Sequence, residues 1–171
     1  KCENTAATAK TVTVTVNPPA TAADINVAGA DAPYCAGTRA KLVATTTTVT
    51  APVFNWYSDA ALTKLVFTGA TFNTPVLTAT TTYYVTVRGS NKCENTAATA
   101  KTVTVTVNPP ATAADINVAG ADAPYCAGTK AKLIATTTTV TAPIFNWYSD
   151  AALTKLVFTG VTFETPVLTA T

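Results

Sequence analysis

The most reactive side chains in this 171-residue sequence are four cysteines, at positions 2, 35, 93 and 126. They form no CxxC pair, so disulfides are favoured over a metal site. Disulfides persist in oxidising compartments, which predicts an extracellular location. Two pairings are open. One joins Cys2 to Cys35 and Cys93 to Cys126; the other joins Cys35 to Cys93 and leaves Cys2 and Cys126 to partners outside the sequence.

Other reactive groups are few. The sequence contains no histidine, which excludes a Ser–His or Cys–His nucleophile pair and a histidine metal site. Its acidic residues form no DxD run or EF-hand pattern, and no glycine-rich phosphate loop is present. Asp24 or Asp31, together with loop carbonyl groups, could form a calcium site. Ordinary solvated carboxylates in turns are the favoured interpretation of both residues. We therefore expect no enzyme activity, no catalytic residues, no metal and no cofactor.

An aromatic pair, Trp56-Tyr57, offers one possible ligand contact. Adjacent residues of a strand point to opposite faces, so one of the two must lie outside the core. Tyr57 is the outward candidate and would be able to stack on a sugar ring. The alternative is an exposed aromatic side chain with a purely structural role.

The stretch TVTVTVNPP occurs at Thr11–Pro19 and again at Thr102–Pro110. Its valines alternate with threonines, which is typical of a half-buried strand with Val toward a core and Thr toward water. The two prolines end the strand because proline donates no ladder hydrogen bond. We interpret the stretch as the last strand of a domain that runs into a stiff linker.

The sequence also contains an internal repeat. Residues 1–80 return at 92–171 with five differences, which indicates tandem modules of 91 residues. With the linkers as boundaries, residues 1–18 are the end of one domain, 19–109 a complete domain, and 110–171 a domain without its last strands. A Cys2–Cys35 bond would cross a linker, whereas a Cys35–Cys93 bond stays inside one domain and is favoured.

Between the two Pro-Pro pairs, seven to eight short β-rich segments alternate with turn signals every 8–12 residues, and no helical period occurs. This pattern predicts an all-β fold of tandem immunoglobulin-like β-sandwiches with 7–8 strands each. The net charge is +2 and the basic residues are scattered, so nucleic acid is not an expected partner. No apolar run reaches 18 residues, so no membrane span is expected.

The order of motifs resembles a bacterial Ig-like family that occurs in tandem in giant surface proteins of Bacteroidetes, including SprB-type gliding adhesins. The resemblance rests on YCAG at 34–37, WY at 56–57, TGATFNTPVL at 68–77, TTYYV at 81–85, Cys93 and VTV at 103–105. It implies export by the type IX system, a structural or adhesive role at the cell surface, and a Cys35–Cys93 disulfide. The family has no active site to carry over.

The leading functional hypothesis is a disulfide-locked spacer or multivalent display module of a long extracellular adhesin or filament. The resemblance extends this hypothesis to a role in gliding motility. Its expected partners are neighbouring repeats of the same protein, surface polysaccharide or like chains. One alternative is a lectin-like module that binds glycan through Tyr57. Another is a filament subunit that assembles by donation of a strand such as Lys10–Val16 to a neighbouring chain.

Overall fold

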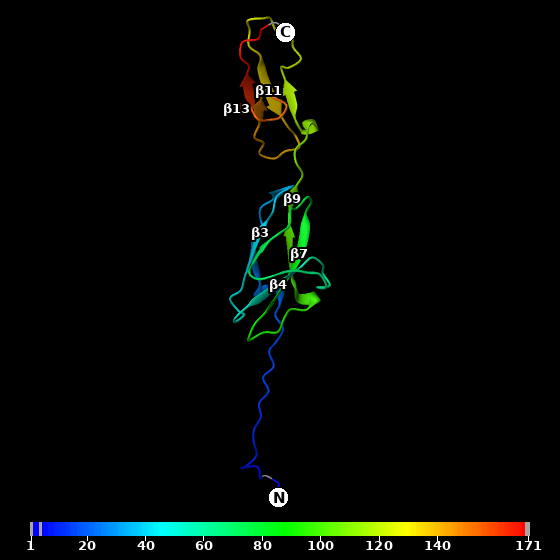
Figure 1. The fold of residues 1–171 in the computed structure, drawn as a ribbon, viewed down its shortest axis with the longest axis vertical. Coiled ribbons are helices and arrows are strands. Elements are labelled where there is room, and N and C mark those ends of the chain that lie inside the picture. Colours follow the sequence, from blue (N-terminus) through cyan, green and yellow to red (C-terminus); the bar gives the residue numbers. More distant parts are fainter. Residues whose placement is uncertain (1, 4, 170–171) are drawn as a thin grey trace. The chain divides into compact units, whose positions relative to one another are not determined.

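The computed structural model describes residues 2–3 and 5–169. It divides the chain into two compact units between Pro109 and Pro110. In the described residues of both units the regular elements are strands, apart from three short 3-10 turns (Figure 1). The fold is therefore all-β, as predicted.

The first unit is a sandwich of two antiparallel sheets. One sheet has the order β1-β3-β6, with bounds Asn26–Ala28, Lys41–Thr45 and Thr71–Asn73. The other has the order β5-β4-β7-β8, with bounds Leu65–Thr68, Val53–Tyr57, Thr81–Arg88 and Lys101–Val105. A short parallel pair adds β2 (Tyr34–Cys35) and β9 (Val107–Asn108). Two 3-10 turns, η1 (Ala22–Asp24) and η2 (Ala97–Thr99), complete the unit.

Aromatic side chains fill the space between the two sheets. Trp56 of β4 is fully buried and packs against Phe72 of β6, with ring centroids 5.3 Å apart. Tyr83 of β7 meets the same Phe72 edge-on at 5.2 Å. The Trp56 indole also donates a hydrogen bond to the Gly69 carbonyl at 2.9 Å. Because Phe72 contacts aromatic side chains of β4, β5 and β7 in the opposite sheet, it is the central packing residue of the core.

The two copies of TVTVTV have different structures. In the second copy, β8 pairs with β7 along its length, and Val103 and Val105 are buried. In the first copy residues 11–16 form no strand, and Val12, Val14 and Val16 are 76–84% exposed. The strand predicted at 11–16 is therefore absent. No described strand lies beside it, and a lone strand has no ladder hydrogen bonds to stabilise it.

The second unit repeats the early strands of the first. Its strands are β10 (Asn117–Ala119), β11 (Lys132–Thr136), β12 (Asn146–Tyr148), β13 (Leu156–Thr159) and β14 (Thr162–Glu164), and its 3-10 turn is η3 (Ala113–Asp115). Within its described residues, 110–169, nothing corresponds to β7, β8 and β9. As a result Ile116 is 44% exposed, whereas its counterpart Ile25 is 1% exposed.

The same difference shortens a strand. Val53 and Phe54 of β4 find their ladder partners only on β7. Their counterparts Ile144 and Phe145 have no such partner in the described residues, and β12 begins only at Asn146. Pairing with β7 thus decides how much of this sequence becomes strand.

Candidate functional site

The outer face of the sheet β5-β4-β7-β8 carries Tyr57, the candidate ligand contact. Trp56 points into the core, whereas Tyr57 is half-buried on the opposite face. Its partner across the ladder is Tyr84 of β7, which is also half-buried. Two aromatic side chains therefore lie on neighbouring strands of one face.

A polar cluster borders these tyrosines. The Glu94 carboxylate accepts hydrogen bonds from the Asn55 amide at 2.8 Å and from the Thr86 hydroxyl at 2.5 Å. The Tyr57 hydroxyl lies 3.5 Å from the same oxygen. Burial, together with the negative charge of Glu94, raises the pKa of Tyr57, so the phenol stays protonated at neutral pH. The hydroxyl is available as a weak donor, and the exposed part of the ring as an apolar surface.

Asp24 has a different role from the one considered for calcium. It is 6% exposed, and its carboxylate accepts hydrogen bonds from Lys92, Thr48 and Thr21. The Lys92 ammonium, with help from Thr48, holds the pKa of Asp24 far below its usual range. Asp31 is exposed and lies outside this group. Among the described residues, no three His, Cys, Asp or Glu side chains converge as metal ligands would.

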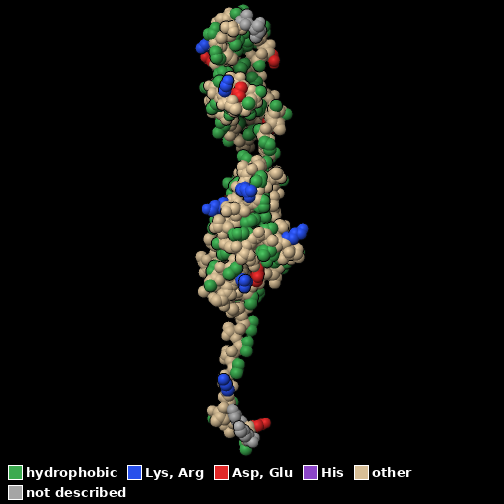
Figure 2. Space-filling model, viewed as in Figure 1, with side chains coloured by type: hydrophobic (Ala, Val, Ile, Leu, Met, Phe, Trp, Pro, Cys, Tyr) green, Lys and Arg blue, Asp and Glu red, His purple; other side chains and the backbone are tan. Residues whose placement is uncertain are grey.

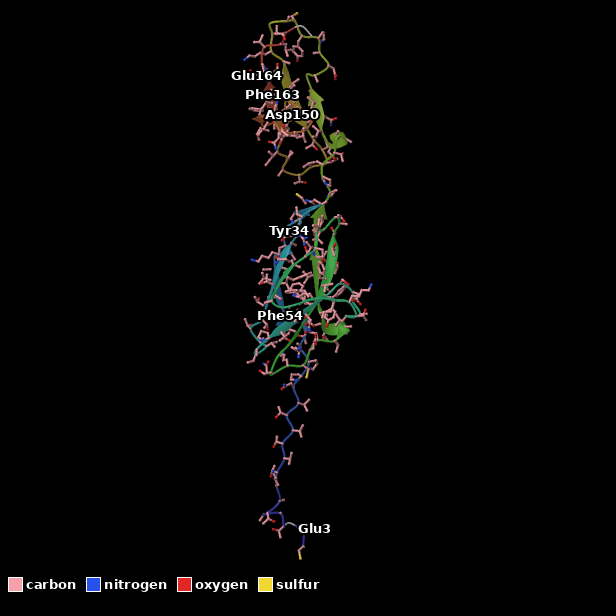
Figure 3. All side chains as sticks on the ribbon, in the orientation of Figure 1. Glu3, Tyr34, Phe54, Asp150, Phe163 and Glu164 are labelled. Atoms are coloured by element: carbon pink, nitrogen blue, oxygen red, sulfur yellow. The ribbon has the colours of Figure 1, made fainter. Side chains whose placement is uncertain are left out.

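The four cysteines are all exposed free thiols. Cys35 lies in β2 beside Asn108 of β9, and Cys93 lies beside Pro19. These two positions are at opposite ends of β7, because Thr80 contacts Val107 before the strand and Gly89 pairs with Lys92 after it. Figure 3 shows Tyr34, the neighbour of Cys35, at one end of the first unit.

The length of β7 sets the distance between the two thiols. Eight residues of strand span about 25 Å, whereas bridged cysteines need Cα atoms within about 7 Å of each other. The structure thus does not bring Cys35 and Cys93 together, and the expected Cys35–Cys93 bond is not formed in it.

Both Asn-Pro-Pro segments are hydrogen-bonded to the first unit. At its start, the Cys93 amide donates to the Pro18 carbonyl at 3.0 Å, and the Ala20 amide donates to the Cys93 carbonyl at 2.9 Å. The Asn17 side chain donates to the Ser90 carbonyl at 2.8 Å. At the other end, β9 pairs with β2, and the Ala36 amide donates to the Asn108 carbonyl at 3.0 Å. The sequence analysis did not predict these contacts, because the prolines indicated only a linker.

The second unit has a groove of about 410 Å³, which we interpret as an uncovered part of its core and not as a ligand site. Ile116, Ile144 and Trp147 line it, and their counterparts in the first unit belong to the sandwich core or its edge. The strand-donation hypothesis requires a donated strand to pair beside β12, the counterpart of β4. Residues 101–105, the repeat of 10–14, pair with β7 and not with β4. A donated strand 10–16 would therefore not reproduce the native neighbour of β12.

The charged side chains form no broad patch of one sign on the face seen in Figure 2, where they occur singly or as small groups of opposite sign. In the part of the chain that the structure describes, no helix has the length and apolar character needed to cross a bilayer.

Comparison with known families gives one match. The family model described as "Ig-like domain CHU_C associated" matches residues 20–109 and again residues 112–171. A search of curated proteins finds no significant match.

Proposed function

Since the chain belongs to the family of Ig-like domains associated with CHU_C, we propose that it is a structural repeat of a long extracellular surface protein. Each repeat acts as a spacer and as a module for multivalent display. The near-identity of consecutive copies supports this role, because reach and valency grow with copy number without any new chemistry. Its partners are neighbouring repeats of the same protein.

The observation that carries the proposal is the attachment of the Asn-Pro-Pro segments. At the first segment, Asn17, Pro18 and Ala20 are bonded to residues 90–93. At the second, Asn108 is bonded to β2. A segment held by main-chain bonds and containing two prolines has little freedom to bend, which suits a load-bearing spacer.

The finer role that we propose is adhesive. A surface adhesin of this kind, exported by the type IX route and used in gliding, would present many identical faces to surface polysaccharide or to like chains. The absence of histidine agrees with a role that needs no catalysis.

The spacer role is tested with chains of two, three and four complete 91-residue repeats, studied by small-angle X-ray scattering. We expect the maximum dimension to rise by the same increment with each repeat. A dimension that grows only as the square root of the repeat number would mean flexible joints and would contradict the proposal. For location, antibodies against residues 19–109 should label intact, unpermeabilised cells that produce the protein.

A second candidate function is glycan binding, and the pairing of Tyr57 with Tyr84 on one outer face favours it. Two half-exposed rings beside the Asn55 amide combine the stacking surface and polar groups that sugars need. Glycan-array binding by the chain, lost in Tyr57→Ala and retained in Tyr34→Phe, would support it. Equal glycan binding by the chain and by Tyr57→Ala would contradict a role for this face.

A further inference from the structure

A groove of about 440 Å³ opens at one edge of the sandwich in the first unit. Strand β4 ends at Tyr57, opposite Tyr84, so residues 81–83 of β7 have no strand beside them on that side. In the other sheet, β6 is an outermost strand. The groove lies among these strands, and its lining includes Arg39, Ser58, Phe67, Phe72, Asn73 and Tyr83.

The apolar part of the groove is aromatic. Phe67 of β5 stacks on Phe72 of β6, with ring centroids 5.5 Å apart and 19° between the ring planes. Phe72 is buried, whereas Phe67 is 37% exposed. Part of the Phe67 ring is therefore open to the groove, as a flat apolar surface on which the C–H groups of a ligand ring can pack.

Tyr83 brings a polar group without a protein partner into the same groove. The residue is 4% exposed, and its hydroxyl forms no hydrogen bond with a described residue. Every fully shielded side-chain oxygen or nitrogen in the described chain has a partner, so the Tyr83 hydroxyl must reach solvent through the groove that Tyr83 lines. Burial raises the pKa of Tyr83, so the phenol stays protonated at neutral pH. It is available to donate to a ligand oxygen.

The groove carries positive charge. Of its described lining residues only Arg39 is charged, and in the described part of the chain its guanidinium forms no ion pair. One nitrogen, Nη1, donates to the Thr74 carbonyl at 3.1 Å, which leaves further donors for a carboxylate. Lys41 is the ladder partner of Asn73 and adds a second cation beside the rim. The charge of the groove is therefore complementary to an anion.

The two copies of the repeat differ in polar residues only at this groove. Residues 1–80 and 92–171 differ at five positions, and three of these exchange one apolar residue for another. The two polar differences are Arg39/Lys130 and Asn73/Glu164, and both first-copy residues line the groove. Glu164 adds a negative charge where the first copy has a neutral amide. We therefore expect the two copies to differ in their affinity for an anion.

We propose that the groove of the first unit binds a uronate, a sugar ring with a carboxylate, within an acidic polysaccharide. The carboxylate binds Arg39, and the sugar ring packs on Phe67. The sugar hydroxyls bond to the polar groups of Ser58, Asn73 and Tyr83. An apolar acid would leave those three groups without partners, and a neutral sugar would leave the guanidinium without a counter-charge.

This site deepens the adhesive role proposed above, on which it rests. It is distinct from the outer face that carries Tyr57 and Tyr84, because Tyr83 points from β7 into the sandwich and its neighbour Tyr84 points away from it. One repeat thus has an edge groove for an acidic sugar in addition to its outer aromatic face.

The test is a titration of the 171-residue chain with hexagalacturonate, followed through the amide signals of its NMR spectrum. The matched probe is the fully methyl-esterified hexagalacturonate, which keeps the sugar rings and lacks the charge. We expect hexagalacturonate in the millimolar range to shift the signals of residues 39, 73 and 83. The ester should bind at least tenfold more weakly, because the charged hydrogen bonds to Arg39 are lost.

Four variants locate the site. Arg39→Gln should weaken hexagalacturonate binding at least tenfold, whereas Arg88→Gln, at the other arginine of the chain, removes the same charge elsewhere and should not change it. Asn73→Glu copies the second repeat and should also weaken binding at least tenfold. Tyr83→Phe removes only the hydroxyl and should weaken binding about fivefold. Unchanged amide signals away from the groove confirm that each variant is folded.

Three results would overturn the proposal. They are equal binding of the two probes, equal effects of Arg39→Gln and Arg88→Gln, and no signal shift with hexagalacturonate in the millimolar range. Binding that is lost in Tyr57→Ala and unchanged in Tyr83→Phe would assign the sugar to the outer face instead. None of these results affects the spacer role, which the scattering experiment tests separately.

Discussion

The Lys92 ammonium lies 2.6 Å from the Asp24 carboxylate and joins the connection after β7 to the first turn of the same unit. The two residues are 68 positions apart in the sequence, and Asp24 is 6% exposed. Thr48, from the connection between β3 and β4, donates to the same carboxylate. Three separate segments of the first unit are therefore fastened at one buried charge.

Lys92→Met should destabilise the first unit by about 3 kcal/mol, because a buried carboxylate loses its counter-charge. Native-state hydrogen exchange of the β7 amides measures this free energy of unfolding. Lys41→Met, at an exposed lysine of β3, is the matched control and should change it by less than about 0.5 kcal/mol. Equal effects of the two substitutions would show that the ion pair contributes little.

The same pair should make stability depend on pH in acid. The pKa of Asp24 is lowered in the folded unit, so its stabilisation is fully present above the unfolded value of about 3.9. As pH falls below about 4, the unfolded chain takes up the proton first, and the stabilisation is lost toward the lower folded pKa. Urea unfolding of the chain and of Asp24→Asn should differ by a constant amount between pH 5 and 7. That difference should shrink steadily below pH 4. A difference that is unchanged at pH 2.5 would rule out this linkage.

The two tryptophans allow a comparison inside one molecule. Trp56 is fully buried, whereas Trp147 is half-buried because no described residue replaces β7 over it. Trp56→Ala should cost the first unit about 3–5 kcal/mol, the usual range for removal of a buried aromatic side chain. Trp147→Ala should cost the second unit clearly less. Hydrogen exchange on peptides of each unit measures both effects, and the reverse order would contradict the burial difference.

The strands and the inward direction of Trp56 could be predicted from the sequence because alternation and turn residues are local signals. Which copy of TVTVTV forms a strand could not be predicted, since both copies have the same residues and only the second has β7 beside it. The distance between Cys35 and Cys93 was also hidden, because sequence separation does not reveal that a whole strand lies between them. The contacts of Asn17 with residues 90–93 depend on the same long-range arrangement.

Two glycines with similar backbone angles should respond differently to alanine. Gly29 and Gly37 have φ of +91° and +88°, a region that costs other residues about 1 kcal/mol or more. A Cβ at Gly29 would collide with the Lys41 carbonyl oxygen of β3, whereas one at Gly37 would meet nothing within 4 Å. Gly29→Ala should therefore destabilise the first unit by at least about 1 kcal/mol more than Gly37→Ala in urea unfolding. Equal costs would indicate that β3 shifts to accept the methyl group.

The attachment of the first Asn-Pro-Pro segment to the first unit includes one side-chain hydrogen bond, which can be removed without a change to the prolines. Asn17 donates to the Ser90 carbonyl at 2.8 Å, and the other contacts of the segment come from the backbone and from the Cys93 thiol. Asn17→Ala should weaken the attachment by about 1 kcal/mol, the typical net contribution of a hydrogen bond. The amides of Ala20 and Cys93 should then exchange roughly fivefold faster, as RT ln 5 is about 1 kcal/mol. Thr13→Ala, in the exposed stretch 11–16, is the control and should leave both rates unchanged. If Asn17→Ala also leaves both exchange rates unchanged, the backbone bonds alone hold the Asn-Pro-Pro segment, and its attachment does not depend on the asparagine side chain.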